Sequence, residues 1–593
     1  MAVTESDFRN WSDSLVELSI LESINLDTAW PVVEQFSKIV RLSGSDQERN
    51  ALDILIGHLE SWGAPYTLHE PECFISWPIG ATLRTLGNDA VTLHAKTTAM
   101  ARSTDGEEIE AELVYAPPRI PENTVDDWSY GLDFTGLDPA GKIVIADGMA
   151  SPGRVIDVMK AGAIAAVFVN PGEAIHESIV TTIWGTPDLD SSALVDAQLP
   201  VLGVNRREGD ALIAKVKAGP VHVAVSTTVD TRWRTIPVLV ADIPGSEIAD
   251  EFVLLHGHLD SWHEGVGDNA TGDASMLEIA RVFWQNREQL KRGVKVAWWS
   301  GHSHGRYAGS TWFADTFAIE LAKSCVAQVN CDSPGCRWAN TYNELTATTE
   351  TWKLIDSAIR DTTGITPNPE RPPRAGDYSF NGIGISSFYM LSSTMSQEAR
   401  DQKGYYPVGG CGANIQWHTE DDLMPIADRD NLLRDIRMYA TSILRVTNAL
   451  LLPFDWRAVT AEFKETLTTY ANAAGGVFDF GPAFSAVDEL DQALTALYAT
   501  EPTTEDAIAS FNRTQRMLSR ILVPVNYSRA LPFHHDPAVE VPALPDLEPS
   551  LTAARITGDT HQEGMLRAHL LRGRNRLVWA LIQAKDEVDL ALT

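Results

Sequence analysis

The sequence has few cysteines and no long hydrophobic run, and these two features exclude several classes of protein. Its five cysteines are odd in number and form no C-x-x-C pair, which argues against a disulfide framework and for a reduced, cytoplasmic compartment. No apolar stretch reaches the roughly 18 residues that a membrane span needs. The opening MAVTESDFRN carries acids early and lacks the pattern of a secretory signal, so none is expected.

Positive charge is also scarce, with 47 lysines and arginines against 80 aspartates and glutamates in 593 residues. The net charge of −33 disfavours binding to nucleic acid or to an anionic membrane surface. The expected partners are therefore small molecules or proteins. Hydrophobic residues make up 44% of the chain, which is typical of a soluble globular protein, and the length predicts two or three domains.

The hydrophobic periodicity changes along the chain and predicts its organisation. Residues 1–72 have a helical pattern, and residues 73–235 mix short β-rich runs with helices, like a compact inserted module. Strand and helix patterns alternate through residues 236–454, and residues 455–593 are helical. Alternation of this kind predicts an α/β fold with a mainly parallel, doubly wound sheet covered on both faces.

Histidines and aspartates follow the predicted strands of this α/β region. His258 and Asp260 end the run EFVLLHGHLD, and Asp268 lies in the loop that comes next. Asp332 follows another strand in VNCDS, and His418 occurs later in QWHTEDDL. Because functional groups gather at the carboxyl ends of parallel strands, we expect these side chains to meet. One histidine at a strand end is usually structural, but together the residues indicate a site for zinc or a similar dication.

The ordered motifs HxDSW, GDNATGD, a tryptophan followed by GS, NCDS and WHT resemble a known family. They are similar to the co-catalytic zinc peptidases, which include bacterial aminopeptidases, glutamate carboxypeptidase and the transferrin receptor. The resemblance implies that residues 73–235 form a protease-associated apical insert between the two parts of the catalytic domain, 1–72 and 236–454. It also implies that residues 455–593 form a helical domain that makes a homodimer.

The resemblance assigns a role to each candidate ligand. His258 and Asp332 would hold one metal ion, His418 would hold the other, and Asp268 would bridge the two. Asp260 would orient the His258 ring from behind. The implied cofactor is a pair of divalent metals, with zinc first and Mn, Fe or Co as alternatives.

The family's adjacent glutamates, a general base followed by a metal ligand, are replaced in this chain. Counting back from the pair Gly309–Ser310 puts Ser303 at the base and His304 at the ligand. A neutral imidazole can replace a carboxylate ligand, whereas an unactivated hydroxyl cannot accept a proton near neutral pH. His302 is a candidate substitute base, and a turn residue facing water is the alternative.

Further departures from the family pattern leave alternatives open. Trp417 stands where the glutamate carboxypeptidase branch has a tyrosine, and its indole lacks phenol acidity. Cys411 either ligates or attacks from its glycine-rich loop, or is buried and inert. His263 is a second candidate base or a solvated loop residue. Arg371 and Arg374 either clamp a substrate carboxylate or lie on the surface.

These observations lead to three hypotheses of function. The first is a metal-dependent hydrolase that cuts an amide or other C–N bond of a small, carboxylated substrate and is not a conventional peptidase. The second is a lyase or isomerase in which the metals stabilise an enolate-like intermediate. The third is a non-catalytic binding protein like the transferrin receptor, against which the retained ligands argue.

Overall fold

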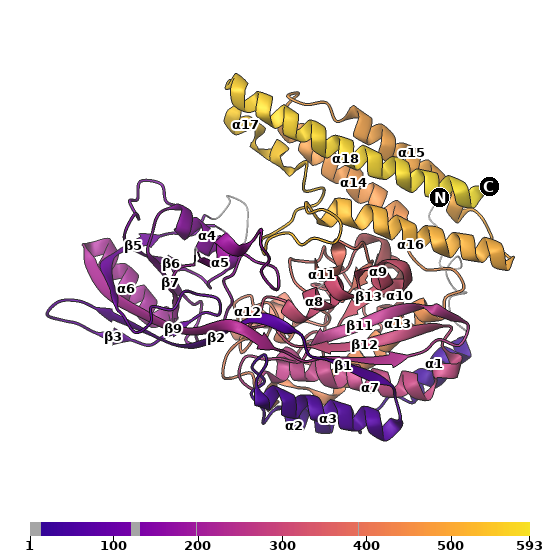
Figure 1. Ribbon diagram of the computed structural model, residues 1–593, viewed down its shortest axis with the longest axis horizontal. Coiled ribbons are helices and arrows are strands. Elements are labelled where there is room, and N and C mark those ends of the chain that lie inside the picture. The colour runs from indigo at the N-terminus through magenta and orange to yellow at the C-terminus, as the bar shows by residue number, and fades with distance from the viewer. Residues whose placement is uncertain (1–13, 120–130, 197, 377, 390) are drawn as a thin grey trace.

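A computed structural model describes residues 14–119, 131–196, 198–376, 378–389 and 391–593 of the chain. Two β-sheets and a bundle of helices make up three parts of the molecule (Figure 1). The chain leaves the first sheet after one strand, builds the second sheet, returns to the first and ends in the bundle. Within this described part of the chain, no helix combines the length and apolar character that a membrane span requires.

The first sheet has six strands in the order β1-β10-β12-β11-β13-β14. The pairs β11/β12, β11/β13 and β13/β14 are parallel, which confirms the predicted mainly parallel α/β sheet. β1 and β10 form an antiparallel edge, because residues 244–247 are too short a link to give β10 and β11 the same direction. The strands are β1 (Tyr66–His69), β10 (Val238–Ile243), β11 (Ile248–His258), β12 (Arg292–Trp299), β13 (Cys325–Asn330) and β14 (Ser387–Phe388).

Strand β11 is covered on both faces, which explains its continuous apolar run FVLL. Val253 and Leu255 join the core that includes α2, α3 and α7, while Phe252 and Leu254 join the core of α8 and α9 on the other face (Figure 1). The helices of this part are α1 (Ser14–Glu22), α2 (Ala29–Phe36), α3 (Asp46–Trp62), α7 (Thr271–Gln285), α8 (Ala308–Thr316), α9 (Ala318–Ser324), α10 (Trp352–Thr363), α11 (Tyr378–Asn381), α12 (Gln397–Lys403) and α13 (Arg429–Thr447).

The second sheet has eight strands in the order β3-β2-β9-β5-β6-β7-β8-β4. Its long strands β2 and β9 pair antiparallel from Glu72↔Thr235 to Thr85↔Val223 and connect it to the first sheet (Figure 1). Two apolar cores lie in this part. Its elements are β2 (Glu72–Thr85), β3 (Thr92–Leu93), β4 (Ala95–Thr97), β5 (Ile109–Ala116), β6 (Ile143–Asp147), α4 (Pro152–Lys160), β7 (Ala165–Val169), α5 (Ser192–Asp196), β8 (Val201–Val204), α6 (Arg206–Ala218) and β9 (Val221–Thr235).

The C-terminal helices contact both sheet-containing parts, and the four segments expected from the sequence stay predictions. Arg520 Nε donates a 2.9 Å hydrogen bond to the Ala322 carbonyl in α9 of the first-sheet part. Beyond α16, the Ala538 N–H donates to the Thr182 carbonyl of the second-sheet part at 3.0 Å. The helices are α14 (Trp456–Ala474), α15 (Gly481–Tyr498), α16 (Glu505–Tyr527), α17 (Ala553–Ile556) and α18 (Thr560–Leu592).

Candidate metal centre

The three central strands of the first sheet end beside one another, and each delivers polar residues to the same edge. His258 is the last residue of β11, the segment 300–304 follows β12, and Asp332 follows β13. Because β11 pairs in parallel with both neighbours, these residues meet at its carboxyl end. This is the edge of an α/β sheet at which ligands bind.

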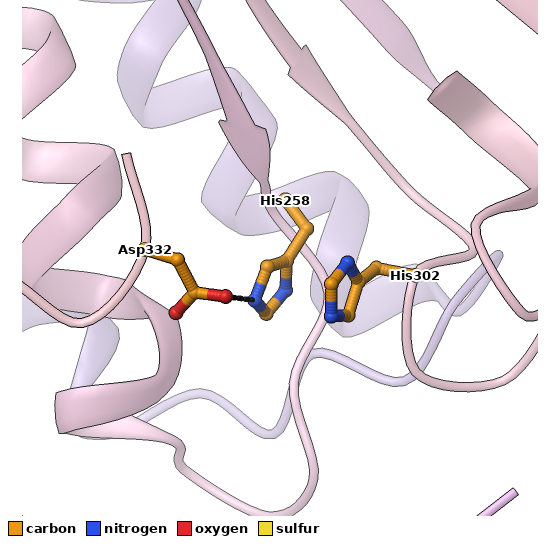
Figure 2. Close-up of side chains that lie close together, drawn as sticks. All are labelled: His258, His302 and Asp332. Atoms are coloured by element: carbon orange, nitrogen blue, oxygen red, sulfur yellow. Dashed lines mark ion pairs between the residues drawn. The ribbon is translucent and has the colours of Figure 1, made fainter. Parts of the chain in front are cut away.

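His258 points its Nε2 atom at two carboxylates. Nε2 lies 2.9 Å from Asp268 Oδ1 and 3.5 Å from Asp332 Oδ2 (Figure 2 shows the ion pair with Asp332). Nδ1 lies 2.8 Å from the Asp260 carbonyl oxygen, to which it donates. Because Nδ1 is held as a donor, loss of the Nε2 proton to make way for a cation would leave the Nε2 lone pair facing the carboxylates, which is the tautomer of a metal ligand.

His418 approaches the same aspartate from the other side. Its Nε2 lies 3.1 Å from Asp268 Oδ2, and its Nδ1 lies 3.0 Å from the Glu177 carbonyl oxygen. The Glu177 N–H in turn donates to the His418 carbonyl at 2.8 Å. Glu177 belongs to the second-sheet part, so that part fixes the ring orientation of a residue at the first-sheet edge. Trp417 stacks on the His418 ring with centroids 3.6 Å apart.

The donor atoms of this cluster fit a divalent cation. Two carboxylates converge on one ring nitrogen, and the buried atoms His258 Nε2 and Asp268 Oδ1 are 2.9 Å apart but not aligned for a hydrogen bond. Burial would lower the pKa of His258, but Asp268 and Asp332 raise it well above its usual value. Burial would raise the pKa of Asp268, but His258 and His418 hold it well below its usual range. Such a site attracts positive charge, and imidazole with carboxylate is a typical donor set for zinc.

Side chains around the cluster hold its backbone in place. The Asp422 carboxylate accepts the N–H groups of Gly267 at 2.7 Å and Asp268 at 3.0 Å. Asn269 Nδ2 donates to the carbonyls of His258 at 3.3 Å and Cys331 at 3.0 Å. Sequence reasoning missed these roles, although both residues lie inside the motifs that attracted attention.

Asp260 acts through different atoms from those expected. Its carboxylate lies 4.0 Å from His258 Nδ1, and its backbone carbonyl makes the contact instead. The carboxylate accepts the N–H groups of His302 at 3.2 Å and Ser303 at 2.8 Å, and the Ser43 hydroxyl at 2.8 Å. Asp260 therefore orients the ring through its main chain and fixes the turn after β12 through its side chain.

His304 contacts Ser43 and Trp262, and the ligand role expected from counting back to the GS pair stays a prediction. Its Nδ1 lies 2.9 Å from the Ser43 hydroxyl, and its ring packs on Trp262 with centroids 4.2 Å apart. The ring is fully buried there, and its Nε2 has no hydrogen-bond partner. The neighbours His302 and Ser303 line the cavity described below and His304 does not, and the spacing of residues in the sequence does not encode this difference.

His302 is the residue of this turn that comes closest to the cluster. Its ring stacks on His258 with centroids 3.8 Å apart and planes 10° from parallel (Figure 2). Among the described residues, His258, His302 and Asp332 offer ligand atoms that all lie within 4.8 Å of one another. Burial, followed by the charge of His258, lowers the pKa of His302 well below its usual value, so the ring is neutral.

A second group of titratable side chains lies beside the cluster. Glu177 Oε1 is 3.1 Å from His263 Nε2 and 3.0 Å from Lys96 Nζ. Lys96 also forms an ion pair with Glu420. The ammonium group already provides the positive charge here, so His263 belongs to an ion-pair network between the two sheet-containing parts.

Cys411 is a buried thiol and not a ligand of the cluster. Its Sγ lies 3.4 Å from Asp422 Oδ2, and burial raises the thiol pKa well above its usual value. A thiol with a raised pKa is a poor nucleophile and a poor metal ligand. Of the two alternatives for this residue, the structure therefore favours the inert one.

A cavity of about 1010 Å³ opens onto the candidate metal centre. Its walls include Asp268, Asp332 and His418 of the centre, Ser151 of the second-sheet part and Val539 of the C-terminal part. A volume of this size suits a small organic molecule or short peptide. All three parts of the chain therefore shape the space in which a substrate would bind.

The comparisons with known proteins agree with this geometry. Residues 239–441, which span β10 to most of α13, match the model of peptidase family M28. This segment of the chain is therefore similar to M28 peptidases. Among curated proteins, it is 20% identical over 371 residues to a probable glutamate carboxypeptidase of Arabidopsis thaliana, covering 53% of this chain and 52% of that one. It is 29% identical over 167 residues to a probable leucine aminopeptidase of Aspergillus fumigatus, covering 28% and 31%. The chain thus spans about half or less of the curated relatives it matches.

Solved structures share the fold of this protein. An aminopeptidase from Aneurinibacillus sp. strain AM-1 superposes with a TM-score of 0.53 at 18% identity, covering 72% of this chain and 95% of that one. A peptidase M28 precursor from Shewanella amazonensis gives a TM-score of 0.53 at 17% identity, covering 74% and 96%. The recognition of a zinc peptidase-like fold from the sequence motifs is therefore confirmed.

Proposed function

We propose that the protein is a metal-dependent hydrolase that cleaves an amide or other C–N bond of a small, carboxylated substrate. The observation that supports this most is the convergence of two imidazole Nε2 atoms on the Asp268 carboxylate at the wall of a large cavity. A zinc aminopeptidase of Bacillus subtilis has a similar fold, which supports zinc as the metal, with Mn, Fe or Co as alternatives.

His258, Asp268 and Asp332 would hold one ion, and Asp268 with His418 would contribute to a second. A bound dication polarises a carbonyl group and lowers the pKa of water. The Asp260 and Glu177 carbonyls each accept a hydrogen bond from Nδ1 of one ring and so keep Nε2 available. The protein thus prepares both rings for coordination.

His302 is the proposed proton acceptor. Its ring lines the cavity beside His258 and is neutral, so it has a lone pair that can take a proton from a group within hydrogen-bond reach. The lowered pKa makes the ring a weak base, which suits water whose own pKa a bound dication has lowered. The Ser303 hydroxyl lines the same cavity and can donate or accept a hydrogen bond, but it is not a base. The absence of a carboxylate from positions 302 to 304 is our reason for proposing a substrate other than an ordinary peptide.

We also propose a homodimer formed through the C-terminal helices. Six large apolar side chains are exposed on α18, and at 3.6 residues per turn five of them, all but Leu592, share one side of the helix. A second copy of the same face would cover them, and changing Trp579 to Glu should shift the mass measured by light scattering from dimer to monomer. The five residues are Met565, Leu571, Trp579, Ile582 and Leu590.

Two further expectations from the sequence belong to this proposal. The second-sheet part is proposed to be a protease-associated insert, since it contributes Ser151 and Glu177 to the cavity wall. A reducing, cytoplasmic setting is proposed because all five cysteines are buried free thiols.

The proposed reaction can be tested with zinc-loaded protein and a panel of N-acyl amino acids and dipeptides. We expect release of free amine, measured with an amine-reactive dye, and loss of about 100-fold or more of this activity on chelation or in Asp268→Asn. An ultraviolet-absorbing alkene without free amine would indicate a lyase instead. Zinc-loaded protein that binds these compounds and converts none would favour a binding protein.

A further inference from the structure

Arg306 is an arginine without an ion-pair partner at the wall of the cavity. Among the described residues, no carboxylate forms an ion pair with its guanidinium, and its Nε is buried without any hydrogen-bond partner. Its one described contact is with the ring of Tyr307, 5.2 Å from the guanidinium carbon. Buried arginines without an ion pair elsewhere, such as Arg374 and Arg520, donate to backbone carbonyls, whereas no hydrogen bond of the Arg306 side chain is present among the described residues.

The other arginines of the cavity are already bound to protein groups. Arg371 donates to Glu462 at 3.2 Å and to the Asn526 carbonyl at 2.8 Å. Arg374 donates to the carbonyls of Asp536 and Pro537, so it holds the C-terminal segment in place. The two arginines considered as carboxylate clamps from the sequence are therefore structural.

The backbone around Arg306 supports a use for its side chain. Arg306 and Tyr307 have φ values of +48° and +68°, a region that costs a non-glycine residue roughly 1 to 2 kcal/mol. Glycine would avoid this cost at both positions. The same turn provides His302 and Ser303 to the cavity, so the strained pair lies next to the proposed reaction site.

We propose that Arg306 binds a carboxylate of the substrate and thereby selects acidic substrates over neutral ones. This inference rests on the proposed function, since it names the substrate class of the same cavity. A guanidinium can donate two parallel hydrogen bonds to a carboxylate, and this pairing satisfies the orphaned Nε. Arg306 would thus be a specificity residue, while the metal ligands act on the bond that is cleaved.

The test measures binding, so it does not depend on turnover. Zinc-loaded full-length protein is titrated by calorimetry with N-acetylglycine and N-acetylglutamate, and with their carboxamides. We expect the acids to bind about 10- to 100-fold more tightly than the amides, and Arg306→Gln to remove that preference. Arg306→Lys should restore part of it, because an ammonium keeps the charge and loses the paired geometry.

Arg529→Gln is the matched control, since Arg529 lines the same cavity and forms a 3.5 Å ion pair with Glu548. Its preference for acids should equal that of the wild type, and all variants should match in zinc content and thermal unfolding. Three outcomes would overturn the inference. They are equal binding of acids and amides, no binding of any acid, and an unchanged preference for acids in Arg306→Gln. Acid binding through Arg306 without release of amine would instead refute only the proposed hydrolysis.

Discussion

The two imidazoles that flank Asp268 are held in different ways. His258 is the last residue of a central β-strand, and its ring donates to a carbonyl only two residues along the chain. His418 lies in a loop with a φ of +56°, and its ring donates to Glu177, 241 residues away in the second-sheet part. One ligand is therefore fixed by local structure and the other by contact between two parts of the chain.

The two sides also differ in the number of donors. On the first side, Asp268 and Asp332 both approach His258 Nε2, and His302 lies against its ring. On the second side, Asp268 is the only described carboxylate that forms an ion pair with His418. Metal affinity grows with the number and rigidity of ligands, so we expect a tight site at His258 and a weak one at His418.

The largest expected effect comes from removing one imidazole at a time. His258→Ala should lower the affinity of the tight site by about 100-fold or more, since losing a direct ligand exceeds the effect of losing an outer partner. His418→Ala should leave one tightly bound equivalent in place. Metal analysis after dialysis gives the zinc that stays bound to each variant, and a zinc titration then gives the affinity of each site. If both variants lost zinc equally, the two sites would have the same affinity, which would contradict this prediction.

A carboxylate placed in the turn after β12 should strengthen the weak side. Ser303 lines the cavity with Asp268 and His418, so Ser303→Glu adds a donor there. We expect the second equivalent of zinc to bind about 10- to 100-fold more tightly and dipeptide hydrolysis to rise, because a carboxylate also serves as a base. Calorimetry and amine release measure the two effects.

His304→Glu is the matched control for this change. The ring of His304 is buried, with Nδ1 3.8 Å from Asp260 Oδ2, so a carboxylate there would be buried beside another. We expect a loss of stability on the order of 3 to 5 kcal/mol and no gain of metal. If His304→Glu strengthened zinc binding and Ser303→Glu did not, the orientation of this turn would be wrong.

The ligand types and their positions at strand ends could be read from the sequence. His258, Asp268, Asp332 and His418 lie in short motifs, and the alternation of strands and helices predicts that parallel strand ends meet. The antiparallel edge at β10 could also have been derived, because its link to β11 is too short for a parallel crossover.

The remaining features depend on geometry that spacing does not encode. Whether His302, Ser303 or His304 faces the metal depends on the conformation of one turn, which the Asp260 carboxylate fixes by accepting two of its N–H groups. Glu177 orients His418 through its backbone carbonyl, which every residue type has, so the sequence does not indicate this role. Arg306 became informative only when its guanidinium was found to lack an ion-pair partner among the described residues.

The smallest expected effect comes from loosening the contact that holds His418. Lys96 forms ion pairs with Glu177 and Glu420, which keep the Glu177 backbone beside His418. Lys96→Met should weaken the second zinc equivalent by about 10-fold, as expected for an outer partner of a ligand, and leave the tight equivalent unchanged. Lys142→Met is the control, because Lys142 pairs with Glu112 at 2.9 Å within the second-sheet part. A matching loss of zinc in both variants would point to general destabilisation of that part, whereas a loss confined to Lys96→Met would show that His418 depends on the other sheet for its position.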